Sequence, residues 1–147
     1  MRGGDVTQVS GKEYERGIVA GQKHVLVIDD DPDFLDYVTI VLSANDYRVR
    51  TARSAGEGLE MMRQDLPDLV MLDVMISYAL DGWDVSRQMQ SDSRLRDIPV
   101  LIVSAIVSRE DDDLLASDKG GRVDAFMSKP LEPSALLSCV AGLIRTS

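Results

Sequence analysis

Acidic, hydroxyl and basic side chains follow four short apolar runs of this 147-residue sequence. The run VLVI ends in the aspartates 29–31, LVML ends in Asp73, IPVLIVS ends in Ser104, and FMS is followed by Lys129. Carboxylates are ligands for a hard divalent cation, Mg²⁺ before others. A hydroxyl and an ammonium group can bind the oxygens of a phosphoryl group. If the fold brings these side chains together, they form a site for handling a phosphoryl group.

Each of these residues also has an ordinary structural explanation when it is taken alone. An aspartate or a serine after a strand is usually a turn residue or a helix cap, and a lone lysine is usually a solvated charge. Asp31 fits this description, because Pro32 follows it at the first position of a predicted helix. Asp29 and Asp30 do not fit it. Polar residues also stand at the ends of three other predicted strands, and this coincidence favours a shared site.

Apolar runs alternate with helical patterns from residue 24 onward, and this alternation predicts the fold that would position the site. The expected strands are 24–28, 47–51, 69–72, 98–104 and 123–128, the second of them an edge strand. The first expected helix starts at Pro32, and three more cover 54–64, 83–92 and 109–118. A closing helix has five residues on its apolar face: Leu136, Leu137, Val140, Leu143 and Ile144. Five strands each followed by a helix predict an α/β fold, a doubly wound (βα)₅ chain with a central five-stranded parallel sheet.

The predicted strand order, 2-1-3-4-5, makes the first and third strands neighbours. Ligands of such sheets bind at the carboxyl ends of the strands, where the strand order reverses. Asp29, Asp30 and Asp73 then face one crevice, and three carboxylates at close range need a counter-charge. A bound Mg²⁺ ion would supply it.

Charge and composition indicate one acidic domain with a short extension. The chain carries a net charge of −9, of which residues 1–23 hold +1 and residues 24–147 hold −10. We interpret 1–23 as a flexible N-terminal extension and 24–147 as the domain. Its negative charge disfavours direct binding of nucleic acid and suits a partner with basic patches or a metal ion.

The sequence carries no sign of a membrane or an export route. No apolar run approaches the roughly 20 residues that span a bilayer, and the polar start indicates no signal peptide. The single cysteine, Cys139, excludes an internal disulfide and fits the cytoplasm. The single histidine, His24, is the first residue of the first predicted strand, and we expect it on the surface.

The segments VLVIDDDPD, PDLVMLDVM, IPVLIVSA and FMSKP resemble the receiver domain of two-component response regulators, a CheY-like family. The resemblance covers about residues 24–145. It implies that Asp73 is the phosphoacceptor and that Asp29 and Asp30 are the acidic pair beside it. The Mg²⁺ ligands would come from this group, Asp30 and Asp73 most directly, together with the backbone carbonyl of Met75.

The resemblance also assigns roles at the ends of the last two strands. Ser104 would be the switch hydroxyl that binds the phosphoryl group, and Ala105 its small neighbour. Lys129 would pair with the phosphoryl group and with Asp73. Lys129 and Pro130 would be joined by a cis peptide bond, and Phe126 would be the aromatic switch residue.

The implied function is a phosphoacceptor switch in a phosphorelay. Asp73 would take the phosphoryl group from a phosphohistidine of a sensor histidine kinase or a histidine phosphotransfer protein. The face formed by the fourth helix, fifth strand and fifth helix would then change and act on a downstream protein or output domain. Such a domain catalyses only its own phosphorylation and dephosphorylation, so it is not a turnover enzyme.

Two loops differ from the usual family pattern. After Asp73 the chain has Ser77 where the family has a proline, and Asp81 and Gly82 arrive one residue late. The segment LLASDKGGRVDAF before the fifth strand also has about one extra residue. The positions that tune the lifetime of the phosphoryl group in this family hold Met75 and Ile106. Both are apolar and cannot position an attacking water, which predicts slow loss of the phosphoryl group.

Two alternatives remain at this stage. Haloacid-dehalogenase-like phosphatases place two aspartates two residues apart after a strand, as Asp29 and Asp31 are here, but this chain has Asp33 where their motif has Thr or Val. They also need more chain than is present. The second alternative is a receiver-like scaffold that binds proteins without being phosphorylated. The sequence leaves open the kinase, the output partner, the oligomeric state and whether the chain is part of a longer protein.

Overall fold

The computed structural model describes residues 21–73, 81–105 and 124–146, apart from the side chains of 81–83 and 146. The described strands are β2 (Lys23–Ile28), β3 (Tyr47–Ala52), β4 (Leu69–Asp73), β5 (Val100–Ser104) and β6 (Ala125–Ser128). They form one sheet in the order β3–β2–β4–β5–β6, and every neighbouring pair is parallel. This is the predicted order 2-1-3-4-5, so the doubly wound (βα)₅ fold is confirmed.

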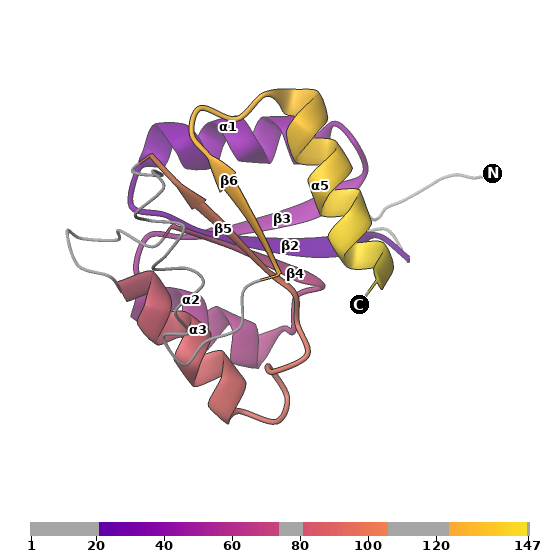
Figure 1. Ribbon diagram of the computed structural model, residues 1–147. Helices are drawn as coiled ribbons and strands as arrows, with labels where there is room; N and C mark the ends of the chain where they lie inside the picture. Colours follow the sequence, from indigo (N-terminus) through magenta and orange to yellow (C-terminus); the bar gives the residue numbers. More distant parts are fainter. Residues whose placement is uncertain (1–20, 74–80, 106–123, 147) are drawn as a thin grey trace.

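Helices cover both faces of this sheet (Figure 1). They are α1 (Pro32–Ser43), α2 (Ala55–Gln64), α3 (Asp81–Ser91) and α5 (Pro133–Thr146). Figure 1 shows α1 and α5 on one side of the sheet and α2 and α3 on the other. The predicted helix over 109–118 lies outside the described residues.

Alternating side chains of the central strands divide the core into two layers. Val25 and Val27 pack with α1 and α5, whereas Leu26 and Ile28 pack with α2 and α3. Because β2, β4 and β5 are buried on both faces, their sequences are continuous apolar runs. The edge strand β3 is only partly buried, in agreement with its alternating sequence.

The helix starts that position the site follow the sequence signals. Asp31 caps α1 by accepting a hydrogen bond from the Asp33 N–H at 3.0 Å, and Pro32 occupies the first helical turn. Ser54 caps α2 by accepting from the Glu57 N–H at 3.2 Å. The chain therefore turns sharply after β2 and after β3, and α1 begins directly beside the acidic pair.

Some expected boundaries shift by one or two residues. β2 begins at Lys23, which pairs with Tyr47, so the expected extension over 1–23 overlaps the strand by one residue. β5 begins at Val100 rather than at 98, because Pro99 has no N–H to donate to the ladder. Residues 1–20, the core of the expected extension, lie outside the described part of the chain.

The expectation that His24 lies on the surface is wrong. His24 is only 4% exposed, because it follows Lys23 inside β2 and faces the layer of α2. Neither ring nitrogen has a hydrogen-bond partner among the described residues, and Nδ1 lies 4.0 Å from Asp65 Oδ2. Burial, and next the charge of Arg48, lowers the pKa of His24. Arg50 also lowers it, while Asp65 and Asp68 oppose the shift.

This burial predicts a pH dependence of stability. The folded state binds the His24 proton less tightly than the unfolded chain does. The contribution of His24 to the free energy of unfolding is therefore complete above the unfolded pKa of about 6.5, and it is lost as the pH falls below that value. We expect His24→Gln to lose less free energy of unfolding than wild type between neutral and mildly acidic pH. Urea unfolding across this range measures the difference, and NMR titration of the single histidine checks the pKa directly. An unfolding free energy with the same pH slope in both proteins would contradict this account.

Two glycines of α2 give a matched test of packing under the site. A Cβ on Gly58 would lie 2.4 Å from Ile28 Cδ1 and 2.8 Å from Cγ1, whereas a Cβ on Gly56 meets nothing within 4 Å. Ile28 is fully buried and directly precedes Asp29. We expect Gly58→Ala to lower the free energy of unfolding by about 1–3 kcal/mol through overpacking. Gly56→Ala should raise it by up to about 1 kcal/mol through helix propensity. Chemical denaturation measures the free energy of unfolding of both variants, and an equal change in the two would contradict the packing explanation.

Candidate functional site

Three carboxylates gather at the carboxyl edge of the sheet. Asp29 and Asp30 follow β2, and Asp73 ends the neighbouring strand β4. One oxygen from each lies within 4.8 Å of the others. Asp29 is 1% exposed, Asp73 is 8% exposed and Asp30 is partly buried. The structure therefore brings together the acidic residues that the sequence predicted to share a crevice.

Both oxygens of Asp29 are held by the protein. Oδ1 accepts a hydrogen bond from the Asp31 N–H at 2.9 Å, and Oδ2 accepts one from Lys129 Nζ at 2.7 Å. Burial raises the pKa of the Asp29 carboxyl, although the hydrogen bonds from Lys129 and from the Asp31 N–H oppose this. The turn into α1 thus fixes the orientation of Asp29.

Lys129 bridges two of the carboxylates. Its Nζ lies 2.7 Å from Asp29 Oδ2 and 3.4 Å from Asp73 Oδ2, and its side chain is 17% exposed. Burial alone would lower the pKa of Lys129, but the hydrogen bond to Asp29 and the charges of Asp29 and Asp73 outweigh burial and raise it. Lys129 is therefore charged, and the group holds three carboxylates against one ammonium.

The ends of β5 and β6 complete the site. Ser104 is 1% exposed and ends β5, whose Val103 pairs with Asp73. The Lys129 N–H donates to the Ser104 carbonyl at 3.0 Å, which fixes the two residues relative to each other. The Lys129–Pro130 peptide bond is cis, as the resemblance implied.

Other predicted site residues lie at the margin of the group or outside the described chain. Ala105 is exposed and lines a pocket next to Lys129. Phe126 is partly buried on the edge strand β6 and packs against the core layer of α2 and α3. Met75 and Ile106 fall outside the described residues, as do residues 74–80 and 106–123, which hold most of the two altered loops.

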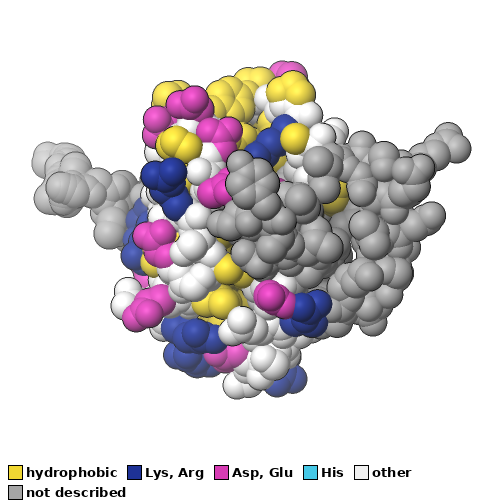
Figure 2. Space-filling view, turned by 90° about the vertical axis from the view of Figure 1, so that its left-hand side faces the viewer, with side chains coloured by type: hydrophobic (Ala, Val, Ile, Leu, Met, Phe, Trp, Pro, Cys, Tyr) yellow, Lys and Arg dark blue, Asp and Glu magenta, His cyan; other side chains and the backbone are white. Residues whose placement is uncertain are grey.

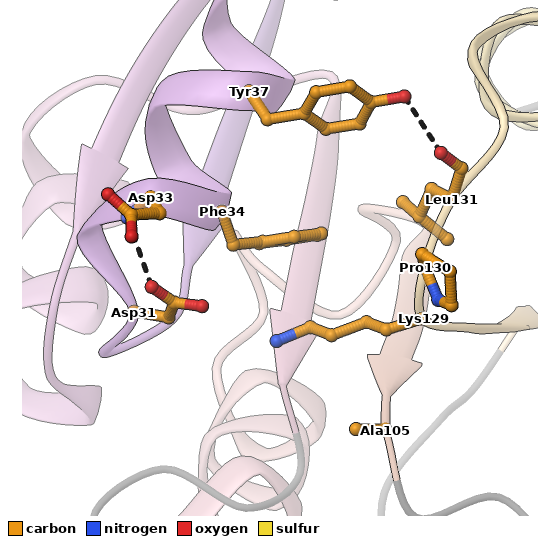
Figure 3. A pocket seen from close by; sticks show the side chains of 8 residues that line it. All are labelled: Asp31, Asp33, Phe34, Tyr37, Ala105, Lys129, Pro130 and Leu131. Carbon is orange, nitrogen blue, oxygen red and sulfur yellow. Dashed lines mark hydrogen bonds between the residues drawn. The ribbon is translucent and has the colours of Figure 1, made fainter.

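Sequence reasoning missed the aromatic residues that surround Lys129. A pocket of about 510 Å³ separates α1 from the connection between β6 and α5. Figure 3 shows Phe34 and Tyr37 reaching across from α1 toward Lys129 and Leu131. The Tyr37 hydroxyl donates to the Leu131 carbonyl at 2.7 Å, and Lys129 Nζ lies 4.3 Å from the centroid of the Phe34 ring. The sequence marks Phe34 only as an apolar residue on one face of α1, and it gives no signal that Tyr37 lies near Lys129.

The donor set fits a hard divalent cation. Three carboxylate oxygens within 4.8 Å of one another are the ligands that Mg²⁺ prefers, and they carry more negative charge than Lys129 neutralises. Figure 2 looks onto this end of the molecule and shows acidic side chains gathered beside hydrophobic and basic ones. The geometry defines an acidic, partly buried group that could hold a metal ion, at the switch point of a doubly wound sheet.

Comparison with known proteins assigns the class of protein. The family model described as response regulator receiver domain matches residues 25–141. The chain therefore belongs to the receiver domains of response regulators, which are not turnover enzymes.

Individual relatives agree with this assignment. The chain is 36% identical over 121 residues to the DNA-binding dual master transcriptional regulator RpaA of Synechocystis, covering 82% of this chain and 48% of that protein. It is 28% identical over 120 residues to protein PilH of Pseudomonas aeruginosa, covering 82% and 96%. It is 34% identical over 121 residues to response regulator PleD of Caulobacter vibrioides, covering 82% and 26%. The chain thus spans only part of two of these three relatives.

Solved structures show the same fold. The receiver domain of NtrX from Brucella abortus has a TM-score of 0.73 at 26% identity, covering 84% of this chain and 99% of that one. The chemotaxis protein CheY4 of Vibrio cholerae has a TM-score of 0.72 at 21% identity, covering 84% and 99%. No described helix is long and apolar enough to cross a membrane.

Proposed function

We propose that this chain is a phosphorylated signalling switch in which Asp73 accepts a phosphoryl group from a phosphohistidine. The donor would be a sensor histidine kinase or a histidine phosphotransfer protein, in the cytoplasm. The observation that carries the proposal is the position of Lys129 Nζ between Asp29 and Asp73, within one carboxyl edge that also holds Asp30.

In the proposed reaction a carboxylate oxygen of Asp73 attacks the phosphorus atom in line with the bond to the histidine nitrogen. The new O–P bond forms as the P–N bond breaks, and the electron pair of the P–N bond returns to the imidazole ring. The Lys129 ammonium and the Ser104 hydroxyl donate to phosphoryl oxygens, whose negative charge they stabilise.

Asp29, Asp30 and Asp73 would hold Mg²⁺, with the carbonyl of Met75 as a further ligand. When bound, the ion would neutralise negative charge on the phosphoryl oxygens and on the three carboxylates. Asp29 and Lys129 orient each other through their 2.7 Å contact, and this leaves the second carboxylate neighbour of Lys129, Asp73, to react.

The proposed output rests on the residues that follow the site. Movement of Ser104 toward the phosphoryl group and inward rotation of Phe126 would change the face of β6, α5 and the predicted helix over 109–118. This is a local electrostatic event that biases a bistable element. The apolar side chains of Met75 and Ile106 would slow hydrolysis of the acyl phosphate. A downstream protein or output domain would bind the changed face differently and so respond to phosphorylation.

The phosphatase alternative conflicts with the position of Asp31. That mechanism needs Asp29 and Asp31 in one site, but the Asp31 side chain is exposed and caps α1, and the described acidic cluster does not include it. Phosphorylation separates the proposal from the scaffold alternative. With Mg²⁺ and acetyl phosphate, intact mass should show a gain of one phosphate-sized group per chain, and no gain would refute the proposal.

Cation binding gives a second test. Without divalent cation, we expect Asp30→Asn to raise the free energy of unfolding by on the order of 1 kcal/mol, because one of three like charges is removed. Mg²⁺ at a hundred times its dissociation constant should stabilise wild type by about 2.7 kcal/mol, and should stabilise Asp30→Asn far less.

Asp31→Asn is the matched control for this measurement. It removes a neighbouring carboxylate from outside the cluster, and Asn also caps helices well. Urea unfolding with and without Mg²⁺ should therefore give this variant a wild-type response. A full Mg²⁺ response in Asp30→Asn would place the cation elsewhere.

A further inference from the structure

The Lys129 ammonium has a third neighbour that is not a carboxylate. Its Nζ lies 4.3 Å from the centroid of the Phe34 ring, within the distance at which a cation is attracted by an aromatic face. Figure 3 shows the Lys129 chain passing beneath the ring, with Tyr37 on the other side of Phe34. The ammonium is thus enclosed by Asp29, Asp73 and an aromatic ring.

The ring is held in place by the start of α1. Phe34 follows the cap at Asp31 and the proline at Pro32, so its backbone is fixed in the first turn of the helix. One turn later, the Tyr37 hydroxyl donates to the Leu131 carbonyl at 2.7 Å and ties α1 to the segment just after Lys129. The ring and the lysine are therefore parts of one braced unit.

Such bracing matters because of the shape of the lysine side chain. Lysine carries its charge on a flexible four-carbon stem, and an ammonium can point in many directions. The shorter contact of Nζ is to Asp29 at 2.7 Å, and its contact to Asp73 is 3.4 Å. Without a third contact, the ammonium could keep its hydrogen bond to Asp29 and move farther from Asp73. The ring face provides an attraction from another side without adding charge.

We propose that Phe34 is a positioning residue, whose ring face holds the Lys129 ammonium at the place where it meets the phosphoryl group on Asp73. This inference rests on the proposed function. A Leu at this position would fill similar apolar space but would lack the ring face, so packing and cation attraction can be separated.

NMR tests the contact itself, whatever the protein does with phosphate. Protons that lie over a ring face are shifted upfield, so the Lys129 Hε signals should be upfield of those of the exposed Lys23. The shift should disappear in Phe34→Leu and remain in Phe34→Tyr. Lys129 signals without an upfield shift in wild type would overturn the inference.

Kinetics test the role in phosphoryl transfer. Followed by intact mass with Mg²⁺ and acetyl phosphate, uptake should slow by roughly three- to tenfold in Phe34→Leu and recover in Phe34→Tyr. Phenylalanine with one, two and three ring fluorines at position 34 should slow uptake step by step, because fluorine weakens the ring face while the shape changes little.

The matched control uses the neighbouring ring of the same pocket. In a Tyr37→Phe background, the same fluorinated series at position 37 should leave uptake at the rate of the unfluorinated Tyr37→Phe protein, because the ring that lies over the ammonium is that of Phe34. If the rate of phosphoryl uptake did not change with fluorination at position 34, the positioning role would be refuted, even if the ring-current shift were present. Absence of any uptake in wild type would refute the proposed function and this role together, while the NMR shift would still decide the contact.

Discussion

Asp73→Asn is expected to take up no phosphoryl group from acetyl phosphate, while wild type gains one per chain. The amide oxygen of asparagine carries no negative charge and cannot form a stable acyl phosphate. Asp73 is the only member of the acidic cluster that ends a strand in the centre of the sheet, next to β5 and its Ser104. Intact mass measured over time checks the result.

The variant should remain folded, which keeps this test clear. Lys129 keeps its shorter contact, 2.7 Å to Asp29, when Asp73 loses its charge. Asp31→Asn is the control, because it removes a nearby carboxylate that is exposed and caps α1. In wild type the added mass should be removed by hydroxylamine, as expected of an acyl phosphate. A gain that persists in Asp73→Asn would identify a different acceptor and refute the assignment.

The fold could be predicted from sequence because its signals are local. Continuous apolar runs mark strands that are buried on both faces, and Asp31 with Pro32 or Ser54 marks where helices start. The site followed from the fold, since parallel strands end at one edge. Asp29, Asp30 and Asp73 could be placed together without any knowledge of side-chain geometry.

The errors share a different cause. His24 was expected on the surface because a histidine before an apolar run carries no signal of burial, and its surroundings are set by Arg48 and Asp65 from other elements. Phe34 has the spacing of an apolar residue on one face of α1, and nothing in the sequence marks it as part of the site. Its contact with Lys129 joins residues far apart in the chain, and periodicity within a helix cannot reveal such a pair. Contacts of this kind depend on side-chain geometry between elements.

The second large effect is expected at Lys129. Lys129→Met should slow phosphoryl uptake by about 10²–10³-fold, the cost of removing one donor aimed at developing negative charge. Methionine keeps much of the apolar stem beside Phe34 but cannot donate to the phosphoryl oxygens. Lys129→Arg keeps the charge on a larger planar group, so it should restore only part of the rate. Intact mass with Mg²⁺ and acetyl phosphate measures all three proteins.

Stability distinguishes this role of Lys129 from a general loss of structure. Without divalent cation, Lys129→Met leaves the carboxylate of Asp29, which is 1% exposed, without its ammonium partner, so the free energy of unfolding should fall by about 1–3 kcal/mol. Mg²⁺ should recover much of this loss, because the cation supplies the missing positive charge, yet uptake should stay slow. Lys23→Met, at the exposed start of β2, should change neither property. If Mg²⁺ restored both stability and rate, Lys129 would serve only to balance charge, and its proposed donation to the phosphoryl group would be wrong.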